Sequence, residues 1–403
     1  MLLFLICCRI SQKYNIFKQG TENDPLSEYL SWKLRTSCSL EVPERKGAGF
    51  RPLIFKRYMH IRSVMKVITF GEIMLRLAPE GYYRFVQAAS YGATYGGGEA
   101  NVAVSLAGFG IDAAFVTKLP KHEIGQGAVN KLREFGVDTS LIVRGGDRVG
   151  IYFLEKGASQ RPSKVIYDRA HSAIAAAAET DFNWDKIFQG VNWFHFTGIT
   201  PALSDSAAAI CLAACKAARS KGITVSCDIN YRVNLWTREK AGEVMGKLME
   251  HVDLCIANEE DAADVFGIKA AGSDVTSGKI SHDGYKEVAS ALAKRFGCKQ
   301  VAITLRESIS ANDNNWGAML FTGNEYYFSK KYAVHIVDRV GGGDSFGAGL
   351  IYANLNGMEA QDRLEFAVAA SCLKHTIEGD FNLVSADEVK KLAAGNASGR
   401  VQR

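Results

Sequence analysis

The sequence predicts an α/β fold in which a mostly parallel β-sheet is covered by helices on both faces, with a small β lid over one edge. Three observations support this. From residue 67 onward, short apolar runs alternate with helical segments, several helical segments stop at a glycine, and two stretches break the alternation. Strands that alternate with helices are typical of parallel sheets, because parallel neighbours need a long crossover connection.

The apolar runs predict strands at 67–70, 114–116, 193–196, 224–227, 254–257 and 301–305. Between them, helical patterns cover 100–109, 125–135, 204–220 and 287–296. Glycines that can end a helix in the left-handed conformation follow these segments: Gly110, Gly136, Gly222 and Gly297. The two interrupting stretches, about 75–95 and 149–167, predict extended antiparallel pieces that form the lid.

The charge distribution separates the first 64 residues from the rest. The chain has 403 residues, with 48 Lys and Arg against 43 Asp and Glu, and residues 1–64 hold 11 basic and 5 acidic side chains. The body therefore holds 37 basic and 38 acidic residues, which argues against a nucleic-acid binding face. Because 1–64 lacks periodicity and a strand begins directly after Met65, we expect a disordered or non-native extension at 1–64 and one folded domain at 65–403.

Cysteine usage and the N-terminal residues predict a cytoplasmic protein with no membrane partner. The nine cysteines are scattered, most of them inside apolar runs, and none shows the spacing of a zinc site. The uncharged start at 1–8 is far shorter than the roughly 20 residues of a membrane span. It also lacks the basic residues and the cleavage site of a signal peptide.

The strongest chemical motif is Asp338-Arg339-Val340-Gly341-Gly342-Gly343-Asp344, directly after the strand-like run 334–337. Three glycines can turn tightly and present bare N–H groups at a helix N-terminus, which favours an anion. A carboxylate just beyond such a turn, that of Asp344, could accept a proton from an attacking hydroxyl. The alternative is a glycine turn with an acidic first helical turn, which stabilises a helix whatever its function. The motif is neither a Walker loop nor a dinucleotide fingerprint.

A second motif, Asn258-Glu259-Glu260-Asp261, follows the predicted strand 254–257. Its oxygen atoms could position a hydrated Mg²⁺ near a polyphosphate, since Mg²⁺ keeps several waters and needs few carboxylates. The alternative is a helix N-cap followed by an acidic first turn.

Two further groups of residues predict a small polar substrate. Gly97, Gly98 and Asn101 open a wholly apolar helix, where amides could bind the hydroxyls of a polyol, although close helix packing would also explain the glycines. Arg232 follows the strand 224–227, and Arg169 lies at the end of the second lid stretch. Two arginines near one pocket suit a carboxylate or a phosphate, and surface ion pairs are the alternative.

In this order, the motifs at 97–104, 228–232, 258–261 and 338–346 resemble those of the ribokinase-like (phosphofructokinase-B type) sugar kinases. The segments 65–87, 304–308 and 374–382 are similar to the branch of that family that phosphorylates 2-keto-3-deoxygluconate. The resemblance implies a three-layer α/β/α sandwich with a β lid. It also implies that ATP lies along the C-terminal half and the sugar acid under the lid.

The resemblance also implies roles for particular residues. It makes Asp344 the catalytic base and Gly341, Gly342 and Gly343 the anion hole. The implied sugar-acid contacts are Gly97, Gly98, Asn101, Tyr152, Tyr167, Arg169, Arg232 and Asp380. The implied nucleotide contacts are Asn230, Asn258, Thr304, Arg306, Ser308, Gly341 and Gly343. Mg²⁺ would be held through water by Asn258 and Asp261, although the family has Glu at the latter position and many members have Gly at Arg306.

We therefore expect ATP-dependent phosphorylation of 2-keto-3-deoxygluconate to 2-keto-3-deoxy-6-phosphogluconate by a homo-oligomer that uses ATP and Mg²⁺. One alternative is a kinase of a neutral ketose or a nucleoside, which the two arginines disfavour. The other is a catalytically silent binding protein of the same fold, which the intact Asp344 beside intact glycines disfavours.

Overall fold

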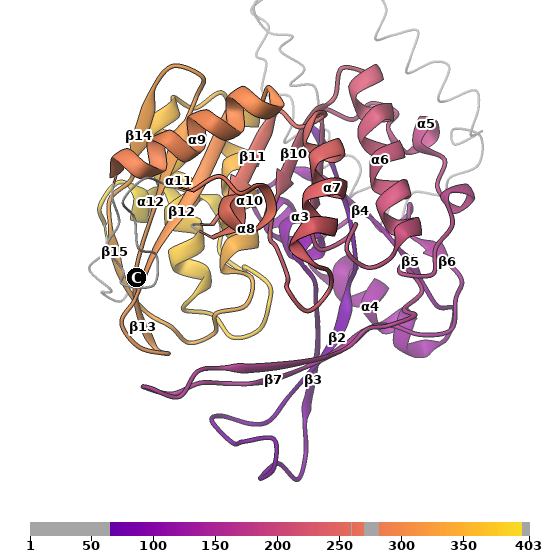
Figure 1. Ribbon diagram of the computed structural model, residues 1–403. Coiled ribbons are helices and arrows are strands. Elements are labelled where there is room, and N and C mark those ends of the chain that lie inside the picture. The colour runs from indigo at the N-terminus through magenta and orange to yellow at the C-terminus, as the bar shows by residue number, and fades with distance from the viewer. Residues whose placement is uncertain (1–64, 259, 270–281, 397–403) are drawn as a thin grey trace, which may run out of the picture. The chain divides into compact units, whose positions relative to one another are not determined.

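The main sheet is built around the apolar run that follows Met65. The computed structural model describes residues 65–258, 260–269 and 282–396, so the expected extension at 1–64 lies outside the described residues. The main sheet has nine strands in the order β14-β13-β12-β11-β10-β9-β1-β4, with β15 beside β13 (Figure 1). The strands from β12 to β4 are parallel, and β13, β14 and β15 pair antiparallel at one edge. The prediction of a mostly parallel sheet is confirmed.

All six apolar runs predicted as strands belong to this sheet. Its strands are β1 (Lys66–Phe70), β4 (Asp112–Val116), β9 (Trp193–Thr197), β10 (Thr224–Asp228), β11 (Leu254–Ala257), β12 (Gln300–Ser308), β13 (Asp313–Phe321), β14 (Tyr326–Phe328) and β15 (Tyr332–His335). The antiparallel strand β13 was not predicted, because its first residues, Asp313 to Asn315, are polar and their pairing with β15 depends on tertiary structure.

Helices cover both faces of the sheet, as the apolar strands require. One face packs against α5 (Trp184–Ile187), α6 (Asp205–Ser220), α7 (Arg238–Met249), α8 (Asp261–Phe266) and α9 (His282–Phe296). The other packs against α3 (Gly98–Gly108), α10 (Gly342–Leu355), α11 (Ala360–Lys374) and α12 (Ala386–Ala393). Adjacent residues of β1 show the alternation, since Ile68 belongs to the first cluster and Val67 to the second. A short helix, η2 (Glu179–Asp181), precedes α5.

The four glycines predicted to end helices all have positive φ angles, between 70° and 88°. They end α3, α4 (Glu123–Glu134), α6 and α9, where a side chain would strain the left-handed backbone. Within the described residues, no helix combines the length and apolar character that crossing a membrane requires.

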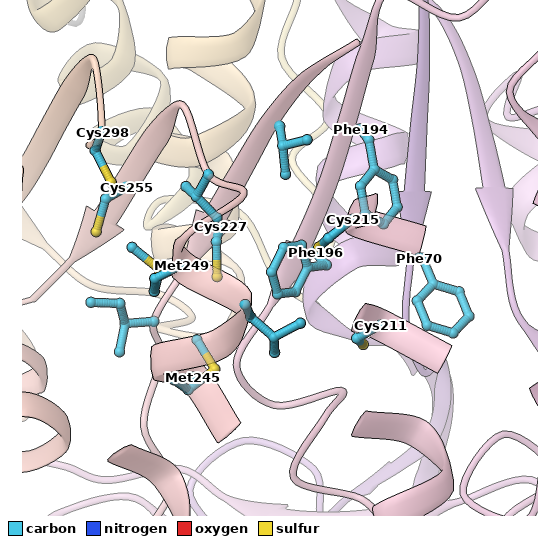
Figure 2. Packing of buried hydrophobic residues seen from close by; sticks show 14 of the residues in the cluster. Phe70, Phe194, Phe196, Cys211, Cys215, Cys227, Met245, Met249, Cys255 and Cys298 are labelled. Carbon is cyan, nitrogen blue, oxygen red and sulfur yellow. The ribbon is translucent and has the colours of Figure 1, made fainter. Parts of the chain in front are cut away.

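The six cysteines of the described body are free and buried, as predicted. Cys227 of β10 and Cys255 of β11 are register partners, and they lie in the same cluster as Phe194 and Phe196 (Figure 2). These thiols fill space between the sheet and its helices.

A separate four-stranded sheet forms from the two stretches that interrupt the alternation (Figure 1). Its order is β3 (Gly92–Gly96), β2 (Met74–Ala78), β7 (Ile151–Glu155) and β8 (Lys164–Asp168). Two of its pairs are antiparallel, but β2 and β7 are parallel, so the expectation of antiparallel pieces is wrong there. The long connection through α3, β4 and α4 brings β7 back in the same direction as β2. That connection also contains the short pair β5 (Lys118–Leu119) and β6 (Val143–Arg144).

The order of the main sheet places a crevice at one end of its central strands. β4 pairs with β1 on one side. On the other side of β1 lie β9, β10, β11 and β12, in the order in which they follow along the chain. Strand order therefore reverses at β1. In open α/β sheets, ligands bind outside the carboxyl ends of the strands at such a reversal.

Candidate active site

A cavity of about 640 Å³ lies at this edge of the main sheet, with walls from the carboxyl ends of its strands and from the small sheet. It brings together the sequence-predicted residues Gly97, Gly98, Asn101, Tyr152, Tyr167, Arg169, Asn230, Arg232, Asn258, Asp261, Thr304, Arg306, Gly341, Gly342, Gly343, Asp344 and Asp380. Ser308 is the exception, because it lines a neighbouring cavity that shares Ser163, Arg306, Ala311 and Arg339 with the first.

The glycine turn forms the N-terminus of α10. Gly341 has φ 84°, and a Cβ there would lie 2.0 Å from the carbonyl oxygen of Asp380, so only glycine fits. Gly343 is exposed to the cavity, and a Cβ there would meet nothing within 4 Å. The first N–H groups of a helix have no acceptor within that helix, and the helix dipole places positive potential on them. The turn is therefore built to bind an anion.

Asp344 lies in the first turn of α10 and meets α3 across the cavity. The side-chain amide of Asn101 donates to Asp344 Oδ2 at 2.7 Å, while Asn101 Oδ1 accepts the N–H of Gly97 at 3.2 Å. Burial raises the pKa of Asp344 to about 6, although the hydrogen bond from Asn101 favours the charged form. A carboxylate that titrates near neutral pH beside an anion site is suited to general-base chemistry.

The two predicted arginines differ in their partners. Arg232 forms no ion pair with an acid among the described residues, and Nη1 donates to the carbonyl oxygen of Tyr231 at 2.9 Å. Arg169 is buried and donates from Nε and Nη2 to Glu72 Oε2 at 2.8 and 2.5 Å. Both arginines line the same cavity, and within the protein Glu72 is the partner of Arg169. That Arg169 contacts the sugar acid stays a prediction.

One wall of the cavity is formed by the small sheet and by the segment after α11. The small sheet contributes Tyr152 and Tyr167, and the segment contributes Asp380. The Tyr152 hydroxyl donates to Asp380 Oδ2 at 2.5 Å, and its ring centre lies 6.2 Å from that of Tyr167. The guanidinium of Arg169 lies over the Tyr167 ring at 5.3 Å. These rings give one side of the cavity an apolar surface with polar edges, which suits a small polyol.

The segment after β11 is held by backbone contacts. Asn258 Oδ1 accepts the N–H groups of Glu260 and Asp261 at 2.8 and 3.0 Å. The Asp261 carboxylate in turn accepts the N–H groups of Asn258 and Tyr231, each at 3.0 Å. Both side chains therefore shape the loop before α8. Next to them, Asn230 has a left-handed φ of 42°, a conformation that costs energy in a non-glycine residue.

The cavity also contains acidic residues to which the sequence analysis gave no role, and Asp228 and Glu99 are two of them. Asp228 ends β10, and burial together with repulsion from Asp261 and Asp344 raises its pKa well above the usual range. Its place directly after a predicted strand was the available signal. Glu99 accepts from Thr197 N, Thr197 Oγ1 and Thr200 Oγ1, and burial raises its pKa to about 7.

The acidic residues of the cavity are the candidates for holding a metal ion. Within 65–258, 260–269 and 282–396, no group of three or more His, Cys, Asp and Glu side chains converges as direct metal ligands. Asp228 and Asp261 nevertheless place repelling carboxylates in one wall of the cavity. Such a wall fits a divalent cation that keeps its waters, as Mg²⁺ does.

Known proteins share this chain's sequence and fold. The family model for the pfkB family carbohydrate kinases matches residues 64–384. A crystal structure of 2-dehydro-3-deoxygluconokinase from Thermotoga maritima is 55% identical, with a TM-score of 0.79, and the match covers 82% of this chain and 98% of that one. A 2-dehydro-3-deoxygalactonokinase from Haloferax volcanii is 31% identical over 334 residues, 83% of this chain and 98% of the relative. A 2-dehydro-3-deoxygluconokinase from Bacillus subtilis is 28% identical over 321 residues, 79% and 92% of the two chains. The chain belongs to the pfkB family of carbohydrate kinases.

Proposed function

We propose that the protein transfers the γ-phosphoryl group of ATP to the terminal hydroxyl of 2-dehydro-3-deoxygluconate, also called 2-keto-3-deoxygluconate. The products are 2-keto-3-deoxy-6-phosphogluconate and ADP. The relatives from Thermotoga maritima and Bacillus subtilis carry the name of this activity.

One observation carries the chemical part of the proposal. Asp344 is half-buried in the first turn of α10, directly after the glycine turn, and both line the same cavity. A proton acceptor and an anion site are thereby adjacent, which is the arrangement that phosphoryl transfer to a hydroxyl needs.

The residues act in a simple sequence. As the hydroxyl oxygen of the sugar bonds to the γ-phosphorus, its proton passes to the Asp344 carboxylate and the bond from phosphorus to the ADP oxygen breaks. The N–H group of Gly343 stabilises the charge on the transferred oxygens, because it is already oriented before the reaction. That of Gly342, which donates a long 3.4 Å bond to the carbonyl oxygen of Arg339, can join it. The amide of Asn101 holds Asp344 in its place throughout.

We also propose a role for Mg²⁺, with Asn258 and Asp261 holding it through water. When bound, the ion would neutralise phosphate charge. The repulsion among Asp228, Asp261 and Asp344 supports a cation in this part of the cavity. Thr304 and Arg306 of β12 line the same cavity and are proposed as nucleotide contacts.

A sugar acid is favoured over a neutral sugar by Arg232. Its guanidinium lines the cavity and forms no ion pair with a carboxylate among the described residues, although it lies near enough to Asp228, Asp261 and Asp344 to favour their charged forms. A planar guanidinium in that state is suited to the two oxygens of a carboxylate. The Haloferax volcanii relative is named for the galactonate analogue, so that sugar acid is the second candidate substrate.

We further propose that the enzyme works in the cytoplasm as a homo-oligomer. The buried, free cysteines of the body support a reducing compartment. On the small sheet, the exposed side chain of Ile166 on β8 supports an additional protein contact, whereas its neighbours Val165 and Tyr167 line the cavity.

A coupled assay of ADP release tests the proposal with 2-keto-3-deoxygluconate, 2-keto-3-deoxygalactonate, gluconate, fructose, ribose and adenosine as acceptors. We expect the highest kcat/KM with one of the two 2-keto-3-deoxy acids. Equal or better turnover of fructose, ribose or adenosine would favour a neutral ketose or nucleoside kinase. No turnover of any acceptor would favour a silent binding protein.

A further inference from the structure

The buried Arg76 on β2 joins the small sheet to the loops around the glycine turn. Its side chain is 3% exposed, and the residue is the register partner of Tyr152 on β7. Nη2 donates to Asp338 at 2.6 Å, and Nη1 donates to Asp380 at 2.8 Å. These acids lie 262 and 304 residues further along the chain. One guanidinium therefore spans two separate loops of the main body.

Both acids control the backbone next to the anion site. Asp338 begins the segment that leads to Gly341, and its carboxylate also accepts the N–H groups of Val340 and Gly379, each at 3.1 Å. The carbonyl oxygen of Asp380 packs against Gly341, where a Cβ would lie 2.0 Å away. Fixing the two carboxylates therefore fixes the backbone on both sides of the turn.

The charges of this cluster balance. Arg76 and the fully buried Lys374 face Asp338 and Asp380, and the Lys374 ammonium donates to the carbonyl oxygen of Ile377 at 3.1 Å. Without Arg76, one buried cation would face two buried carboxylates. The excess negative charge would then lie beside the N–H groups that must bind phosphate, where a low dielectric strengthens repulsion.

We propose that Arg76 is a positioning residue that holds the glycine turn in its anion-binding shape from the small sheet. The small sheet also supplies Tyr152 and Tyr167 to the wall of the cavity, so the residues that face the sugar and the residue that holds the turn share one sheet. A sugar bound there restricts the motion of the small sheet. Because Arg76 joins this sheet to Asp338 and Asp380, the glycine turn at the phosphate site then moves less as well. The catalytic readout of this inference rests on the proposed function.

The first experiment compares Arg76→Met with Arg84→Met. Arg84 is a matched control, because it pairs with Glu155 within the small sheet but is half exposed and touches neither loop. We expect Arg76→Met to lower kcat by about 10- to 100-fold, since small displacements of a reacting group have effects of this size. The KM for the sugar acid should rise by a smaller factor, and Arg84→Met should behave as the wild type.

Amide hydrogen exchange gives a readout that needs no activity. In Arg76→Met, peptides that cover residues 338–345 should exchange faster than in the wild type or Arg84→Met. If the wild type phosphorylates no sugar acid but this difference appears, the proposed substrate is wrong and the positioning role stands. Unchanged exchange over 338–345 in Arg76→Met overturns the positioning role.

Two further variants separate position from charge and from fold stability. Arg76→Lys keeps the charge, but one ammonium cannot span both acids as two guanidinium nitrogens do, so kcat should recover only in part. The double variant Arg76→Met/Asp338→Asn restores the charge balance, so the melting temperature should rise toward wild type while kcat stays low. A wild-type kcat in either of these variants overturns the inference. If Arg76→Met does not fold, these two variants provide the test.

Discussion

The side-chain amide of Asn101 donates a 2.7 Å hydrogen bond to the carboxylate of Asp344, and so joins the first turns of α3 and α10. The two residues are 243 positions apart in the chain. Asn101 cannot donate this bond and rotate freely, because its own oxygen accepts the N–H of Gly97. The bond therefore fixes the direction of the proposed base within the cavity.

Replacing Asp344 by Asn should abolish most phosphoryl transfer. The amide keeps the shape of the side chain but cannot accept the proton, so we expect kcat to fall by about 10²- to 10⁴-fold, the contribution of a general base. Binding of ATP and of the sugar acid, measured by calorimetry, should stay within a few-fold of wild type. Near-normal turnover would show that another group takes the proton.

The pH profile should report the raised pKa of Asp344. A base works when deprotonated, so kcat/KM should fall as the pH falls through about 6. Asn101→Ala removes a hydrogen bond that favours the charged carboxylate, so the pKa should rise and the acid limb should move to higher pH.

Ser105→Ala serves as the control for this shift. Ser105 lies one turn further along α3, and its hydroxyl donates to the backbone carbonyl of Asn101, away from the carboxylate. Its acid limb should match that of the wild type. If Asn101→Ala does not shift the acid limb of the pH profile, the group that titrates in that limb is not Asp344.

Arg232→Ala should raise the KM for the sugar acid and narrow its advantage over neutral ketoses. A charge-assisted contact contributes about 1.5–3 kcal/mol, which corresponds to roughly a 10- to 150-fold change in kcat/KM. Arg232→Lys should restore only part of this, because an ammonium lacks the two-pronged geometry. Arg238→Ala, which removes an exposed arginine from its ion pair with the half-buried Asp264, is the control. An unchanged KM in Arg232→Ala would contradict the carboxylate contact.

Two glycines of the turn should respond differently to Ala. Gly341→Ala places a Cβ against the Asp380 carbonyl at a positive φ, so the protein should lose more than about 1 kcal/mol of unfolding free energy. Gly343→Ala puts its Cβ into open cavity, so stability should stay level or rise by up to about 1 kcal/mol, because Ala favours helix. Its kcat/KM for ATP should nevertheless fall, since the methyl group occupies the anion site. Chemical denaturation and steady-state kinetics check both outcomes.

A chain that begins at Met65 should fold and turn over like the full-length protein. The family match begins at residue 64, and β1 opens with Lys66. Residues 1–64 show no periodic apolar face in the sequence that could complete the core. Expression in the soluble fraction and kcat/KM give the test, and loss of both on truncation would contradict it.

Local patterns in the sequence determined six strands of the main sheet, four helices with their glycine ends and the places where polar loops follow strands. Those features follow from residues close together in the chain: the apolar run 67–70 must be buried, and Gly110 relieves a left-handed backbone whatever it packs against. The glycine turn with Asp344 is also a feature that follows from neighbouring residues in the chain. Its motif is contiguous, so its chemistry could be predicted before its surroundings were known.

Only the tertiary structure decided which charges meet. Arg169 looked available for a substrate, but folding places Glu72 of another segment against it, 97 residues away. Arg76 stands in a strand with no local sign of a role, and it acquires one because Asp338 and Asp380 approach it from the opposite end of the chain. Hydrogen bonds and ion pairs act over a few ångströms of space, and sequence spacing does not encode that proximity for residues hundreds of positions apart.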